Sequence, residues 1–449
     1  MPVIHAAAAL TPEGWRADAR LTVEGGTIVA IETGAARQPD DEGCAILVPA
    51  LSNLHSHAFQ RGMAGLAERR GDQADTFWTW RETMYRFALA MSPDDVEAVA
   101  AELYVEMLEA GFAAVGEFHY LHNAPDGAPY AAPAEMAARI VAAAQATGIG
   151  LTLLPVFYAH ATFDGAPPKP EQRRFITDVD GFARLLDDGR ALMKEVGPVG
   201  VAPHSLRAAT PAEIAAVVAL AGDGPIHIHA AEQVKEVDDC LAWSGARPVE
   251  WLLDHVHVDA RWCLVHATHM TDDETRRLAR SGAVAGLCPI TEASLGDGIF
   301  NAPLYLSEGG AFGVGSDSNV EIGVAAELKQ LEYAQRLRDR ARNVCARSAG
   351  STGRALYERA LAGGAQALGR RSGALKVGAA ADLVSLRAGH PTLAGRSGDA
   401  ILDAWIFAVG NPLVDCVWSG GRKVVADGRH FGRAPIAARY AAAMRRLAP

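Results

Sequence analysis

The chain has 449 residues, of which 49% are hydrophobic and 21% charged, and its formal net charge is −11. This length predicts one large domain with a smaller one, and the composition is typical of a globular protein rather than a disordered one. The acidic balance argues against nucleic acid and against an anionic membrane as partners.

The N-terminal sequence MPVIHAAAALTPEGW has no basic leader and no long apolar segment, so we expect neither a signal peptide nor a membrane span. The six cysteines are far apart and form no CxxC pair, which is typical of reduced thiols. We therefore expect a cytoplasmic protein.

Residues 1–45 include LTVEGGTIVAIETG, which is typical of a β-hairpin. From about residue 45 to 320, short apolar runs alternate with helical patterns. Their near-continuous apolar character indicates parallel strands that are covered on both faces. Eight such runs are present: AILVPALSNLHSH and residues 112–120, 150–158, 199–206, 225–232, 262–269, 284–292 and 312–319.

The segments between these runs carry helix signals. One begins with Ser92 as a cap and Pro93 at the first helical position, and Thr210 and Thr271 begin two later helices. Eight strand–helix units predict an α/β protein with a (β/α)8 TIM-type barrel over residues 46–371. The alternative is an open doubly wound sheet, but no glycine-rich phosphate turn follows an early strand.

Residues 372–430 return to short strands and turns, among them ADLVSL and DCVWSGGRKVVADGRH. We predict that this segment joins residues 1–45 in a small β-sandwich-like domain, and that residues 431–449 form a C-terminal helical tail. The connections 59–91 and 161–180 are long, and long loops at strand ends are often functional.

Polar residues collect at the carboxyl ends of the predicted strands, where barrel enzymes keep their active sites. His55 and His57 follow the first strand, and residues two apart in a strand point to the same face. His229 follows the fifth strand and Asp317 the eighth. Three neutral imidazoles and one carboxylate suit a divalent metal ion, with zinc favoured and iron as the alternative.

Each motif also has a simpler interpretation. A single His-x-His pair can serve packing, and Asp317 or Glu232 can cap a helix. His227 is better explained as a core residue than as a ligand. The order of the motifs along one barrel is nevertheless what a single metal site requires, and Glu232 then has the position of an acid that carries protons.

This constellation resembles the amidohydrolase superfamily over nearly the whole chain, from the split β-domain to ADLVSL. The resemblance implies that Glu232 shuttles protons and that His266 orients the attacking water. The fourth strand ends in APHSLR, without the lysine that bridges two metals in other members, so one metal is expected. The implied metal ligands are His55, His57, His229 and Asp317, and the implied catalytic residues are Glu232, His266 and Asp317.

Within the superfamily, LHSHAFQR, FWTWRE, GEFHYLH, APHSLR and HIHAAEQ resemble the formimidoylglutamate deiminases. The resemblance implies hydrolysis of N-formimidoyl-L-glutamate, a small dicarboxylate, to N-formyl-L-glutamate and ammonia in histidine degradation. It also implies a homodimer. The substrate-binding residues that it implies are Gln60, Arg81, Tyr120, His204 and Arg207.

Guanidinium groups suit a dicarboxylate because they bind carboxylates in a planar, two-pronged geometry. Arg81 and Arg207 also have simpler interpretations, as a surface ion pair and a helix cap. Arg61 alternates away from Gln60 in an extended chain, so we do not assign it to the site. The alternatives are a deaminase or chlorohydrolase acting on purine, pyrimidine or triazine rings and, more remotely, an inactive scaffold.

Overall fold

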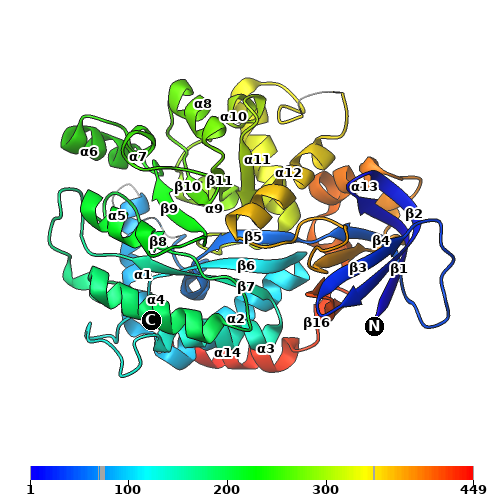
Figure 1. Ribbon diagram of the computed structural model, residues 1–449, viewed down its shortest axis with the longest axis horizontal. Helices are drawn as coiled ribbons and strands as arrows, with labels where there is room; N and C mark the ends of the chain where they lie inside the picture. The colour runs from blue at the N-terminus through cyan, green and yellow to red at the C-terminus, as the bar shows by residue number, and fades with distance from the viewer. Residues whose placement is uncertain (1, 69, 71–75, 347–348, 448–449) are drawn as a thin grey trace.

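The computed structural model describes residues 2–68, 70, 76–346 and 349–447. Helices surround a curved parallel sheet, and a second sheet at one end of the molecule holds strands from both ends of the chain (Figure 1). Among the described residues, no helix combines the length and the apolar character needed to cross a bilayer.

The central sheet is a closed barrel, as the sequence predicts. Within the described residues, its strands form two hydrogen-bonded groups in the orders β5-β6-β7-β8 and β9-β10-β11-β12. A parallel bridge between Ser205 and His229 joins β8 to β9, and one between Ser56 and Asp317 joins β5 to β12. The strands are Leu51–Ser56, Phe112–His119, Gly150–Phe157, Ala202–Pro203, Ile226–Ala230, Trp262–His266, Val284–Leu287 and Ala311–Val314.

Each barrel strand is shorter than the apolar run that predicted it, and in two of the runs a proline explains the difference. The run 199–206 contains only Ala202–Pro203 as strand, because Pro203 has no N–H to donate to a neighbouring strand. In the run 284–292 the strand ends at Leu287, because a helix begins at Pro289. The fixed φ angle of proline suits the first position of a helix.

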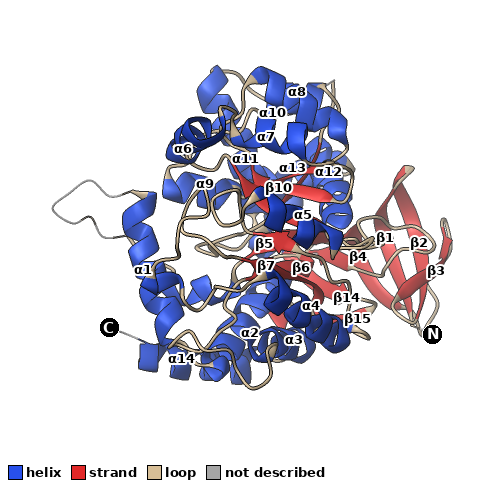
Figure 2. Cartoon of the chain, turned by 60° about the vertical axis from the view of Figure 1, so that its left-hand side comes forward, coloured by secondary structure: helices blue, strands red, loops and turns tan. Residues whose placement is uncertain are grey.

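Helices cover the outside of the barrel, as Figure 2 shows. The predicted caps are confirmed, since the side chains of Ser92, Thr210 and Thr271 each accept a hydrogen bond from a backbone N–H of the first turn. The helices after β5 are α1 Phe77–Ala90, α2 Pro93–Glu109, α3 Glu135–Thr147, α4 Val179–Met193, α5 Pro211–Ala219, α6 Val234–Ser244, α7 Pro248–His255, α8 Asp272–Ser281, α9 Pro289–Leu295, α10 Ala302–Ser307, α11 Val324–Asp339 and α12 Thr352–Ala367.

The second sheet has the order β16-β15-β14-β13-β4-β1-β2-β3. β13 pairs antiparallel with β4, so the two chain ends meet in one continuous sheet with a small core around Leu21, Leu47 and Trp418. The predicted boundaries of this domain stay a prediction. Its strands are Val3–Thr11, Gly14–Glu24, Thr27–Glu32, Glu42–Pro49, Leu383–Leu386, Val414–Ser419, Arg422–Ala426 and Arg429–His430.

The long connections contain short helices. Residues 59–91 include η1 (Ala58–Met63) and α1, and residues 69 and 71–75 of this segment lie outside the described residues. The connection 161–180 contains η2 (Pro170–Gln172). The remaining helices are η3 Pro391–Leu393, α13 Asp399–Ala404, η4 Trp405–Val409, η5 Asn411–Leu413 and α14 Arg433–Leu447, the last of which contacts α2.

Candidate active site

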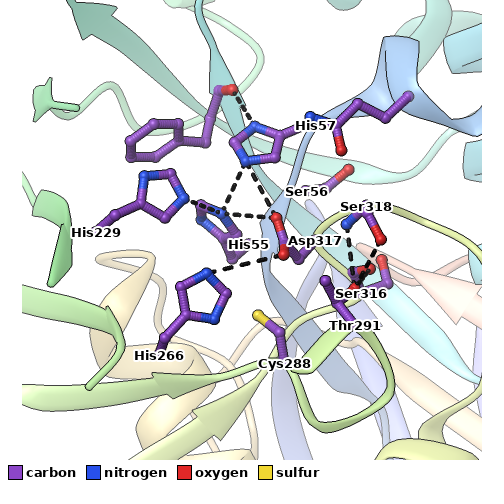
Figure 3. A network of polar contacts seen from close by, with 12 residues as sticks. His55, Ser56, His57, His229, His266, Cys288, Thr291, Ser316, Asp317 and Ser318 are labelled. Carbon is purple, nitrogen blue, oxygen red and sulfur yellow. Dashed lines mark hydrogen bonds and ion pairs between the residues drawn. The ribbon is translucent and has the colours of Figure 1, made fainter. Parts of the chain in front are cut away.

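The four predicted metal ligands converge on one point at the carboxyl ends of the barrel strands (Figure 3). The Nε2 atom of His55 lies 3.2 Å from that of His57 and 3.1 Å from that of His229. Asp317 Oδ1 lies 3.4 Å from His55 Nε2 and 3.1 Å from His57 Nε2. These separations match the roughly 3.3 Å between ligands that surround a zinc ion tetrahedrally at about 2.0 Å.

Hydrogen bonds to the backbone orient two of the imidazoles so that their Nε2 atoms face the cluster. The Nδ1 atom of His57 donates to the carbonyl of Phe118 at 3.0 Å, and that of His229 donates to the carbonyl of His204 at 3.1 Å. Because a carbonyl only accepts, each ring carries its proton on Nδ1 and presents the lone pair of Nε2. Several lone pairs and a carboxylate facing one another require a cation, so these residues fit a divalent metal ion.

Burial and neighbouring charges keep these ligands in the protonation states that a metal needs. Burial lowers the pKa of His55 to about 3 and that of His229 well below its ordinary value, so both rings are neutral. Burial alone would raise the pKa of Asp317, but the neighbouring imidazoles of His55 and His57 hold it well below its usual range. The neutral rings of His55 and His229 and the ionised carboxylate of Asp317 are therefore in the states that a metal ion needs.

The backbone around the site is strained. Non-glycine residues with positive φ are uncommon, because a side chain crowds the backbone in that conformation. Several follow β9, β10 and β12, and strain of this kind persists mainly where a function requires it. These residues are Ala231 (52°), His266 (67°), Ala267 (48°), Asp317 (45°) and Asn319 (60°).

A buried polar network ties the first barrel strand to the last. Asn53 accepts from the backbone N–H of Ser316 at 3.1 Å, and Asn319 donates to the carbonyl of His57 at 3.0 Å. Ser316 also donates to the side chain of Asn319 at 2.6 Å. These contacts fix the chain on both sides of Asp317, and therefore fix the distance from its carboxylate to the histidines.

His266 and Glu232 lie beside the ligand cluster. His266 Nε2 is 3.7 Å from Glu232 Oε1 and 3.8 Å from Asp317 Oδ2, while its Nδ1 is 3.4 Å from Glu292. Burial opposes a charge on His266, but the carboxylates of Glu232, Glu292 and Asp317 raise its pKa to about 10. A metal cation held by the four ligands would repel a proton on His266 and so lower its pKa.

Glu232 is suited to proton transfer by its surroundings. Burial raises its pKa, and the carboxylates of Asp317 and Glu236 act in the same sense, while His266 and Arg207 oppose them. A carboxyl group whose pKa lies closer to neutrality exchanges protons readily at physiological pH. Glu232 therefore has both the position and the environment of an acid–base group.

All the predicted site residues except His55 line one cavity, and His55 lies beneath it with no solvent exposure. The space between the lining atoms measures about 520 Å³, with the open solvent at its mouth included. The predicted residues that line it are His57, Gln60, Arg81, Tyr120, His204, Arg207, His229, Glu232, His266 and Asp317.

The polar groups above the ligand cluster have hydrogen-bonding capacity left over. Gln60 donates from Nε2 to the hydroxyl of Tyr120 at 2.8 Å, whereas its buried Oε1 has no partner among the described residues. The Nε atom of Arg207 is also without a hydrogen-bond acceptor there. Buried groups of this kind ordinarily find partners, so a polar ligand is expected to supply them.

Neither arginine forms a hydrogen bond with a carboxylate of the described residues. Arg207 lies 3.8 Å from Glu232 and 3.8 Å from Glu236, which is longer than a hydrogen bond. Arg81 lies over the rings of Trp78 and Tyr85, and no carboxylate of the described residues is within ion-pair distance of it. Arg81 has no carboxylate partner and Arg207 makes only long ion pairs, so both guanidinium groups can still bind an anion in the cavity.

Other residues singled out in the sequence lie outside the cavity. His227 is fully buried and bonds to the carbonyl of Ala367, in agreement with its assignment to the core. Arg61 forms an ion pair with Glu106.

Sequence analysis missed several cavity residues. Tyr158, Phe175, Trp80 and Tyr85 line the cavity with the predicted residues. Because Tyr158 is the last residue of a predicted strand, its position at the barrel mouth could have been predicted from the sequence. The direction of its side chain could not have been predicted in this way.

Two family profiles together cover most of the chain. The profile of the amidohydrolase family matches residues 46–424, and the profile described as Formimidoylglutamate deiminase HutF, N-terminal domain, matches residues 1–44. Among solved structures, an amidohydrolase from Brucella melitensis superposes with a TM-score of 0.96 at 56% identity, covering 100% of both chains.

Curated relatives agree with these profiles. The formimidoylglutamate deiminase of Pseudomonas aeruginosa is 53% identical over 436 residues, which cover 96% of each chain. A 5-methylthioadenosine/S-adenosylhomocysteine deaminase of Natronomonas pharaonis is 31% identical over 430 residues, covering 93% of this chain and 91% of that protein. The chain therefore belongs to the amidohydrolase family and, within it, to the branch of the formimidoylglutamate deiminases.

Proposed function

We propose that the protein hydrolyses N-formimidoyl-L-glutamate to N-formyl-L-glutamate and ammonia, a step of histidine degradation. The observation that carries this proposal is the pair of guanidinium groups, Arg81 and Arg207, in a cavity that also holds a metal-binding cluster. The substrate has two carboxylates and a small amidine group, so it matches both features. The identity of 53% to a formimidoylglutamate deiminase supports the same substrate.

One divalent metal ion would be held by His55, His57, His229 and Asp317. Zinc is the proposed ion because imidazole nitrogens with one carboxylate are a common zinc ligand set, and iron is the alternative. A divalent ion at this point supplies Lewis acidity, which lowers the pKa of a water molecule toward neutrality.

Arg81 and Arg207 would bind the two carboxylates of the substrate, since a guanidinium group can donate two parallel hydrogen bonds to a carboxylate. Gln60, Tyr120 and His204 would hold the substrate between the arginines and the ligand cluster. The unpartnered Oε1 of Gln60 can accept a hydrogen bond from an N–H of the amidine group.

Glu232 would carry the protons of the reaction. In the balanced reaction, the oxygen of water becomes the formyl oxygen, and both of its hydrogens leave with the imine nitrogen as ammonia. Glu232 lies 3.7 Å from His266, which lies 3.8 Å from Asp317, so the three groups surround the position of the attacking water. His266 would orient this water, Asp317 would help to remove its first proton, and Glu232 would deliver protons to the leaving nitrogen.

The alternative functions have less support. A neutral ring substrate has no carboxylates that would need two guanidinium groups in the cavity, whereas a dicarboxylate does. A scaffold that has lost catalysis has no use for converged ligands. The homodimer and the cytoplasmic location stay predictions from the sequence.

The direct test of the proposed function is incubation of the zinc-loaded protein with N-formimidoyl-L-glutamate. Ammonia and N-formyl-L-glutamate should appear in equal amounts, and adenosine or a triazine should release far less ammonia under the same conditions. Preferential turnover of a ring substrate would contradict the proposal.

Replacing Glu232 with Gln should leave metal binding intact and lower kcat by about 10²- to 10⁴-fold, because a positioned acid–base group contributes that much. Metal analysis and initial rates measure the two effects. Glu82→Gln is a matched control, since Glu82 lies on α1 outside the lining of the inner cavity, and it should behave like the wild type. Full activity of Glu232→Gln would remove Glu232 from the mechanism.

Replacing Arg207 with Ala should lower kcat/KM for N-formimidoyl-L-glutamate by about 10- to 100-fold, because a hydrogen-bonded pair with a charged group is lost. The value for N-butylformamidine, which has the same amidine group but no carboxylate, should change much less, so the ratio of the two values is the measurement. Arg445→Ala, on the exposed side of α14, is the control. An unchanged ratio would argue against a carboxylate site at Arg207.

Replacing His229 with Ala should reduce bound zinc from one ion per chain to well below one, because a ligand is lost. Metal analysis after dialysis measures this, and circular dichroism checks the fold. His227→Gln is a control from the same strand, since His227 bonds to the Ala367 carbonyl instead of the cluster, and it should keep its zinc. Equal zinc in both variants would place the metal elsewhere.

A further inference from the structure

The hydroxyl of Tyr158 lies beside Arg81 in the wall of the cavity. Tyr158 directly follows β7, and its side chain lines the cavity together with Arg81 and His204. The ring is held by an edge contact with His204 at 4.6 Å between centroids and is 3% exposed. Its hydroxyl is therefore fixed in place and shielded from bulk water.

Two hydrogen bonds reach the oxygen of this hydroxyl, and in both the oxygen is the acceptor. Arg81 Nη2 lies 3.0 Å away, and a guanidinium group only donates. Gln172 Nε2 lies 2.8 Å away. The amide of Gln172 cannot be turned around, because its Oε1 accepts from the backbone N–H of Lys169 at 2.7 Å.

The hydrogen of the Tyr158 hydroxyl is consequently left over. A tyrosine oxygen accepts at most two hydrogen bonds and donates one, and here Arg81 and Gln172 use both acceptor positions. Within the part of the chain that the structure describes, no hydrogen bond donated by this hydroxyl is present. A buried hydroxyl without an acceptor is costly, so an acceptor in the cavity is expected.

We propose that Tyr158 is a further substrate-binding and specificity-determining residue, whose hydroxyl donates to the substrate carboxylate that Arg81 binds. This inference rests on the proposed function, because it names a contact that holds one end of the dicarboxylate. A carboxylate accepts several hydrogen bonds at once, and adjacent N–H and O–H donors match it. Gln172 is a positioning residue, since it reaches the substrate only through Tyr158.

Replacing Tyr158 with Phe keeps the ring and removes the hydroxyl. KM for N-formimidoyl-L-glutamate should rise about 10- to 100-fold with little change in kcat, because a hydrogen bond to a charged group is lost. Kinetics with N-butylformamidine should hardly change. Gln172→Leu should raise KM for the dicarboxylate by a smaller factor, since it only frees the hydroxyl.

Tyr130→Phe is the matched control. The hydroxyl of Tyr130 accepts an N–H from Arg174 at 3.4 Å, much as Tyr158 accepts from Arg81, but Tyr130 is not part of the cavity lining. This variant should have the kinetics of the wild type. An equal rise of KM in Tyr130→Phe and Tyr158→Phe would mean that the loss of either hydroxyl acts by destabilising the fold. That result would overturn the proposal.

Binding of N-formyl-L-glutamate, measured by titration calorimetry on the zinc-loaded protein, separates this proposal from the proposed reaction. Weaker binding by Tyr158→Phe than by the wild type supports the contact between the Tyr158 hydroxyl and the carboxylate. If the same proteins show no turnover, only the proposed reaction is overturned. Equal Kd values for the two proteins overturn the role of Tyr158. Absence of binding by the wild type overturns it as well.

Discussion

The structure depends on the close approach of three imidazole nitrogens and one carboxylate at the mouth of the barrel. Their separations of 3.1 to 3.4 Å are unfavourable for groups that all present lone pairs, unless a cation lies between them. The bridges that close the barrel, Ser56 to Asp317 and Ser205 to His229, are also the ones that bring distant ligands together. The contacts that close the barrel therefore also hold the metal-binding residues together.

The electrostatics of the cavity change with distance from this point. At the bottom, burial keeps His55 and His229 neutral, so the ligands are ready for a metal ion. Above it, neither Arg81 nor Arg207 forms a hydrogen bond with a carboxylate of the described residues, and Arg207 makes only long ion pairs. The chain as a whole carries a formal charge of −11, which repels a dianionic substrate at long range. Local guanidinium groups therefore have to provide the attraction, and the cavity concentrates them next to the reacting centre.

Much of this arrangement could be predicted from the sequence, because in a parallel barrel the residue that ends a strand faces the common mouth. That rule placed His55, His57 and Asp317 at the barrel mouth without coordinates. The capping residues Ser92, Thr210 and Thr271 correctly marked where three of the helices begin. The roles of the substrate-binding residues came from family resemblance. The shortness of β8 depends on pairing around Pro203, which an apolar run does not reveal. The role proposed for Tyr158 depends on the orientation of the Gln172 amide group, which is known only from its side-chain contacts.

The most direct test of the central claim is a zinc titration of protein that has been freed of metal with a chelator, with ammonia release from N-formimidoyl-L-glutamate as the signal. Activity should be absent at the start, rise in proportion to added zinc and reach its plateau at one equivalent per chain, because one set of four ligands is present. Full activity without metal, or a plateau only at two equivalents, would contradict the account.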